Sequence, residues 1–193
     1  MSVELTVWRE AEPIPRERAR IAYRTILAGT PGEPADPGLL ALAKAFPEHA
    51  TTYPDAVLVA MEPEEMDEIS NRVFAEARSA GLVCYDPQRD LVHNLAPRGV
   101  YPELQLHTGD GMIVVDPDLG LVHDVLGTLS AGNPFTALVV FGSHFLQVSP
   151  GYELEYKEGL LRRTEVADLD AVRQAFDEYA RGERGFLERF TWS

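Results

Sequence analysis

The residues from Phe145 to Ser193 constrain the fold of this chain more than any other stretch. Apolar and charged side chains alternate in Tyr-Glu-Leu-Glu-Tyr-Lys (152–157), as in a strand with one buried face. A Glu-Gly turn at 158–159 predicts a tight hairpin into a further strand over 160–165. A helix capped by Asp168 follows and ends at Gly182. With a first strand over 145–148, we expect three short strands laid against one amphipathic helix.

Aromatic residues are expected to anchor this region. Phe176 and Tyr179 recur at helical spacing on the apolar side of the predicted helix. Trp192 lies in a tail that also carries Phe186 and Phe190, and so much aromatic surface is expected to be docked rather than free. We therefore expect Phe176, Tyr179 and Trp192 to be structural anchors.

The first half of the chain predicts strands and helices in turn. Val3, Leu5 and Val7 alternate with polar residues and predict a half-buried strand, while the apolar run over 56–61 predicts a strand covered on both faces. Amphipathic helices are expected over 16–27 and from Pro63 to Gly81, followed by a strand over 82–85. The order strand, helix, strand, helix, strand predicts an N-terminal α+β subdomain over 1–96.

The second half is expected to form a subdomain of its own. Two prolines and three glycines between 97 and 111 predict a linker there. The subdomain over 112–193 is expected to be an antiparallel meander flanked by two helices, the first capped by Asp116 with Pro117 at its first position. We therefore predict an α+β fold with two small layered subdomains.

Charge limits the classes of partner. Among 193 residues, 31 acids and 17 bases give a formal net charge of -14. Nucleic acid is not an expected partner, because a phosphate backbone is held by clustered Lys and Arg. The charge fits a basic protein partner, and it also fits ordinary solubility.

The single cysteine, Cys84, excludes an internal disulfide framework and a cysteine-based zinc site. The N-terminus lacks a basic region followed by an apolar one, and no apolar run approaches the roughly 20 residues that span a bilayer. We therefore expect a cytoplasmic protein without a membrane partner.

The sequence contains few motifs that are typical of catalytic or metal-binding sites. The five histidines include no His-Glu-x-x-His pattern, and no complete dinucleotide-binding, Walker or nucleophile-elbow motif is found. His107 and Asp110 in His-Thr-Gly-Asp-Gly are candidates to share a metal or a water, or they belong to a polar turn. Glu153 and Glu155 are candidates for acid–base work, or they lie on a solvated face. We expect no catalytic residue, no metal and no cofactor.

The C-terminal half resembles a known family. The order Phe-Leu-Gln-Val (145–148), Tyr-Glu-Leu-Glu-Tyr-Lys-Glu-Gly (152–159), Ala-Phe-x-x-Tyr-Ala-x-Gly (175–182) and Phe-Thr-Trp (190–192) is similar to the Imm1 family of immunity proteins from bacterial polymorphic-toxin systems. The resemblance covers about 112–193. The segment Gly-Leu-Val-Cys-Tyr-Asp-Pro-Gln (81–88) resembles uncharacterised actinobacterial proteins, which imply no activity.

The Imm1 resemblance implies a cytoplasmic antitoxin that binds a cognate toxin domain, often a nuclease or a nucleic-acid deaminase, and occludes its active site. An acidic surface would complement such a basic partner, and we expect the contact to include Glu153 and Glu155. Two alternatives stay open. One is an enzyme of unknown type with a polar site near His107 and Asp110; the other is a non-enzymatic adaptor or oligomerisation module with an apolar exposed face. Both a monomer and a homodimer are compatible with the sequence.

Overall fold

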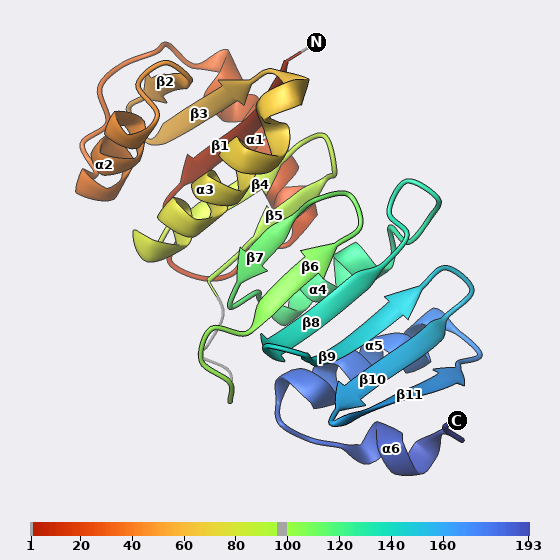
Figure 1. Ribbon diagram of the computed structural model, residues 1–193. Helices are drawn as coiled ribbons and strands as arrows, with labels where there is room; N and C mark the ends of the chain where they lie inside the picture. The colour runs from red at the N-terminus through yellow and green to blue at the C-terminus, as the bar shows by residue number, and fades with distance from the viewer. Residues whose placement is uncertain (1, 96–99) are drawn as a thin grey trace. The chain divides into compact units, whose positions relative to one another are not determined.

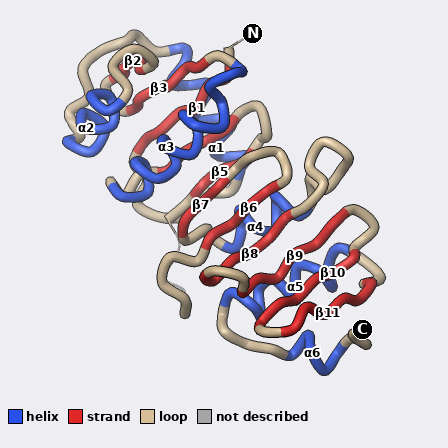
Figure 2. Tube along the Cα trace, viewed as in Figure 1, coloured by secondary structure: helices blue, strands red, loops and turns tan. Residues whose placement is uncertain are grey.

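A computed structural model describes residues 2–95 and 100–193 of the chain. The chain divides into two compact units, unit 1 (Met1–Leu95) and unit 2 (Ala96–Ser193). Each unit has its own antiparallel sheet and its own helices (Figures 1 and 2). The predicted α+β fold is confirmed.

Unit 1 is built on a five-stranded sheet with the strand order β2-β3-β1-β4-β5. Its elements in chain order are β1 (Val3–Trp8), α1 (Arg16–Ala28), α2 (Pro37–Ala45), β2 (Ala50–Tyr53), β3 (Ala56–Met61), the short 3-10 helix η1 (Pro63–Glu65), α3 (Met66–Ser79), β4 (Val83–Asp86) and β5 (Leu91–His93). All neighbouring strands are antiparallel.

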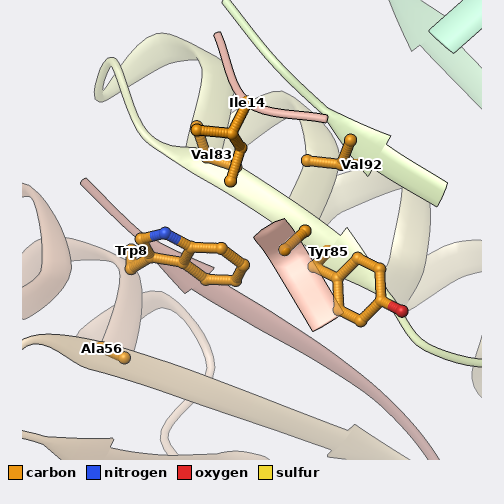
Figure 3. Close-up of a cluster of buried hydrophobic side chains, with 7 residues drawn as sticks. Trp8, Ile14, Ala56, Val83, Tyr85 and Val92 are labelled. Atoms are coloured by element: carbon orange, nitrogen blue, oxygen red, sulfur yellow. The ribbon is translucent and has the colours of Figure 1, made fainter. Parts of the chain in front are cut away.

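Helices cover both faces of this sheet. On one face the indole of Trp8 lies between Ala56 of β3 and Val83 of β4 (Figure 3). Ala19 of α1 belongs to the same buried cluster. On the other face, the Phe74 ring of α3 stacks on the His93 ring of β5, with 4.1 Å between ring centroids. The core of unit 1 therefore has two layers, one on each side of the sheet.

The structure corrects the prediction for the first strand. β1 is the middle strand of the sheet, and both Val7 and Trp8 are buried although their side chains point to opposite faces. β1 is thus covered on both faces instead of half-buried. The strand over 56–61 was predicted correctly, whereas β2 and β5 were not predicted.

Unit 2 is built on a six-stranded sheet with the strand order β11-β10-β9-β8-β6-β7. Its elements in chain order are β6 (Gln105–Thr108), β7 (Ile113–Val115), α4 (Leu119–Leu126), β8 (Thr136–Phe141), β9 (His144–Ser149), β10 (Glu153–Glu158), β11 (Leu160–Glu165), α5 (Leu169–Ala180) and α6 (Gly185–Arg189). β8 to β11 form the predicted antiparallel meander.

One face of the unit 2 sheet carries the core. Leu106, Leu138, Leu146 and Tyr156 are cross-strand neighbours on β6, β8, β9 and β10, and all four are buried. Helix α5 packs on β8 and β9, and α4 packs on α5 (Figure 1). Because side chains alternate along a strand, the residues between these core positions lie on the opposite face.

Two predicted boundaries in this half differ from the structure. The predicted linker, 97–111, contains β6, which pairs with both β7 and β8; residues 97–99 of that segment lie outside the described residues. Helix α4 is capped by Asp118, whose carboxylate accepts from the Leu121 N–H at 2.9 Å, and not by Asp116. The Asp116 N–H instead donates a hydrogen bond to the Leu104 carbonyl, at 2.7 Å.

No helix in the described parts of the chain combines the length and the apolar character needed to cross a lipid bilayer.

Candidate functional site

The face of the unit 2 sheet that points away from α5 is the candidate site, and we call it the open face. Its middle row consists of five residues that lie side by side on β6, β8, β9, β10 and β11: His107, Ala137, Gln147, Glu155 and Arg163. Both predicted contact acids, Glu153 and Glu155, lie on this face, because the residue between them, Leu154, points into the core.

The carboxylate of Glu155 is engaged by its neighbours. It accepts from Gln147 Nε2 at 3.0 Å and from Arg163 Nε at 2.7 Å. The pair with Arg163 is partly exposed, so its contribution to stability is small, about 0–1 kcal/mol. Glu155 therefore presents a neutralised ion pair to a partner and not a free negative charge.

Glu153 carries a charge without such a neighbour. It lies directly opposite Glu165 in the β10–β11 ladder, and both side chains are exposed. Neither acid forms an ion pair with any residue in 2–95 or 100–193. Like charges directly opposite each other destabilise a sheet, so this end of the open face holds negative charge at a cost in stability.

A groove of about 620 Å³ lies beside these two acids. It is lined by Glu153, Arg163, Thr164, Glu165, Arg189, Phe190, Thr191 and Ser193. Its two arginines are paired with acids outside the groove, Arg163 with Glu155 and Arg189 with Glu178. Glu153 and Glu165 are therefore the charges that the groove offers to a ligand.

The wall of the groove is the tail that follows α6. The Arg163 and Ser193 backbones exchange two hydrogen bonds, of 3.0 and 2.9 Å, and Thr164 Oγ1 donates to the Thr191 carbonyl at 2.8 Å. The tail thus pairs with the outer edge of β11 at Arg163 and Thr164.

The aromatic residues hold this wall in place. Trp192 is half-buried, its Nε1 donates to the Phe186 carbonyl at 3.2 Å, and its ring meets those of Tyr156 and Phe186 edge-on. Phe176 and Tyr179 are buried on α5. Desolvation raises the pKa of Tyr179 far above its usual value, which keeps the phenol neutral.

Apolar side chains are exposed at separate places on the unit 2 sheet: Ile113 lies in the middle row beside His107 on the edge strand β7, and Leu161 lies on the opposite edge strand, β11. Ile113 on β7 is 41% exposed and Leu161 on β11 is 43% exposed. Phe141, at the end of β8, is 64% exposed. The open face therefore combines an acidic end, a largely polar middle row and scattered apolar side chains, a mixture found in protein–protein interfaces.

His107 and Asp110, the alternative site, make separate contacts. His107 Nε2 lies 2.7 Å from Gln105 Oε1 on the open face, and burial lowers the pKa of its imidazole. The Asp110 carboxylate accepts from Thr108 Oγ1, whose side chain points to the opposite face of β6. Within the described residues, no three potential ligands are grouped to hold a metal ion.

Alternation in the sequence predicted that Glu153 lies on this face, but it indicated neither Glu165 nor the groove. The position of Glu165 on the open face follows from the Glu153–Glu165 register across the Gly159 turn, and that register was not assigned from the sequence. The groove depends on the pairing of Ser193 with Arg163, which no local sequence signal indicates.

Comparisons of the chain with protein families, with curated proteins and with solved structures found no match. The likeness to Imm1 immunity proteins accordingly rests on the sequence pattern over about 112–193.

Proposed function

We propose that this chain is a cytoplasmic immunity protein that binds a bacterial toxin domain and occludes its active site. The observation that carries the proposal is the open face of unit 2, where Glu153 and Glu165 lie beside the groove and have no ion-pair partner among the described residues.

Charge supports a basic partner. A toxin domain that cleaves or deaminates nucleic acid needs a positive surface to hold phosphates. Two unneutralised carboxylates at the end of the open face, on a chain of net charge -14, complement such a surface and would speed the encounter.

The shape of the face supports a protein partner. The middle row is polar and internally bonded, so it can be buried without leaving Glu155 unpaired. The exposed Ile113 and Leu161, on the two edge strands of the sheet, add apolar area to this polar face, and protein interfaces combine both kinds of surface.

Co-expression tests the proposal in cells. The probe is the C-terminal domain of a toxin whose open reading frame adjoins the gene for this chain, and the absence of such a reading frame would itself count against the proposal. We expect the chain to restore growth of cells that express this domain, and the double variant Glu153→Lys/Glu165→Lys to protect less. Glu188→Lys is the matched control, because it reverses an exposed acid of α6 outside the groove lining.

The possible outcomes test the immunity function and the position of the contact surface separately. If the unaltered chain fails to restore growth, the immunity function is contradicted for that toxin. If the double variant protects as well as Glu188→Lys does, the function stands and the acidic end of the open face is not the contact.

One observation favours a second candidate, an oligomerisation module. Leu160 and Leu161 are 78% and 43% exposed on β11, an edge strand, and exposed apolar edges pair readily with other strands. If the chain is such a module, light scattering should show a dimer that Leu160→Asp converts to a monomer. A monomeric unaltered chain would contradict this candidate.

A further inference from the structure

His93 in unit 1 is a buried polar side chain without polar partners. It is 7% exposed, at the end of the edge strand β5, and its ring stacks on Phe74 of α3 with 17° between the ring planes. Neither Nδ1 nor Nε2 has a hydrogen-bond partner in the part of the chain that the structure describes. A neutral imidazole already loses its hydrogen bonds to water at this place, and a charged one would lose far more.

The charged and titratable groups close to His93 make no hydrogen bond to its ring in the described residues. They are Cys84 and Asp86 of β4, Arg89 of the β4–β5 turn and Arg78 of α3, which donates to the neighbouring Asn94 carbonyl. Arg89 is a cation and disfavours a second positive charge nearby.

Asp86 is the acid among these groups, and donors already occupy it. Its carboxylate accepts from the Gln88 and Arg89 N–H groups, at 3.0 Å each, and from Arg89 Nη1 at 2.9 Å. Three N–H groups thus already engage this carboxylate, and it makes no hydrogen bond with His93 in the described part of the chain.

We propose that His93 is an acid-sensitive latch: uptake of one proton by its imidazole releases β5 from beneath α3 and exposes the Cys84 thiol. Cys84 is the cross-strand neighbour of His93 in the β4–β5 ladder and is buried, so loss of this ladder uncovers it. β5 is an edge strand that pairs with β4 over three residues, so its release breaks this short ladder and the two hydrogen bonds between Asn94 and Ile14.

The direction of the pH dependence follows from burial. Desolvation, followed by the charge of Arg89, lowers the pKa of His93 in the closed form to about 3, whereas an exposed histidine titrates near pH 6.5. The closed form is fully favoured above about pH 6.5 and loses its advantage as the pH falls from there toward 3. The opening equilibrium should rise up to about tenfold for each pH unit in this window.

The rate at which Cys84 reacts with an aromatic disulfide reagent measures the opening, and Cys84 is the single cysteine of the chain. The full chain is compared with His93→Phe, which keeps a ring against Phe74 but does not titrate. The ratio of the two rates cancels the pH dependence of the reagent and of acid unfolding elsewhere. We expect this ratio to rise by up to about tenfold per pH unit between about pH 6 and pH 4.

Two further variants keep the result interpretable. His123→Gln removes a histidine that is paired with Asp177 in unit 2, and it should react as the unaltered chain does. If His93→Phe does not fold, His93→Leu takes its place. A ratio that stays constant from pH 7 to pH 4 overturns the proposal.

Discussion

At the scale of single residues, Gly109 lies where a side chain has no room. A Cβ at this position would lie 2.8 Å from Pro134 Cγ, and the Gly109 N–H donates to Asn133 Oδ1 at 2.8 Å, so neither side can move away freely. We predict that Gly109→Ala destabilises unit 2 by about 1–3 kcal/mol, as overpacking does. Urea denaturation would measure it, with Gly132→Ala as the control, because a Cβ there would meet only Ser130 Oγ, at 3.8 Å. Equal midpoints for the two variants would contradict the tight fit.

Trp192 carries the second prediction at this scale. Its indole contacts the Tyr156 and Phe186 rings and donates to a backbone carbonyl, but it is only half-buried. We predict that Trp192→Ala lowers the free energy of unfolding by about 2 kcal/mol, less than for a fully buried aromatic residue. Glu188→Ala in the neighbouring α6 should leave the thermal melt unchanged. If Trp192→Ala also leaves it unchanged, the tail is not docked on the sheet.

At the scale of elements, α5 depends on its N-terminal cap. The Asp168 carboxylate accepts from the Ala171 N–H at 2.8 Å. We predict that Asp168→Ala destabilises unit 2 by about 1 kcal/mol in chemical denaturation. Asp170→Ala removes an acid from the same turn that is 94% exposed and has only a 3.8 Å contact with Arg173, so its effect should be a few tenths of a kcal/mol. Similar losses for both variants would show that the helix dipole, and not the cap, is what matters.

Elements with a strong local pattern were predictable from the sequence. β3 is apolar at all six positions, and α5 has a cap and a helical apolar stripe. Asp116 and Asp118 are both good caps in the same short segment, and the structure distinguishes them by the bond from the Leu121 N–H and by the extended backbone of Asp118, whereas Asp116 has a φ of 50°.

Elements fixed by distant partners were not predictable. β6 contains one aliphatic residue, Leu106, among Gln105, His107 and Thr108, and it follows a proline-rich segment. It is a strand because β7 and β8 supply hydrogen bonds on both sides. β5 has only three residues and depends on β4 in the same way. Such strands are determined by tertiary contacts that a local pattern does not contain.

At the scale of the whole molecule, the two units each have a complete sheet and a core of their own. Such units can fold alone. We predict that a fragment of residues 96–193 unfolds in a single cooperative transition with mixed helix and strand signals in circular dichroism. A fragment without a cooperative transition would show that unit 2 needs unit 1 to fold.

The candidate site was predictable in kind but not in detail. Alternation along β10 placed Glu153 and Glu155 together on the exposed face, as the structure has them. The sequence does not show that Arg163 neutralises Glu155 or that Glu165 faces Glu153, because both facts depend on the β10–β11 register. The register therefore moves the expected contact from the pair Glu153 and Glu155 to the pair Glu153 and Glu165.

The association rate with the toxin domain tests the central proposal most directly. At low salt, Glu153→Lys/Glu165→Lys should slow association with the domain encoded by the neighbouring gene by about tenfold or more, with the difference shrinking as salt is added. Glu155→Lys is not a clean substitute, since it also breaks the pair with Arg163, whereas Glu188→Lys reverses an exposed acid outside the groove. An association rate for the double variant equal to that of Glu188→Lys at low salt would contradict binding through the acidic end of the open face.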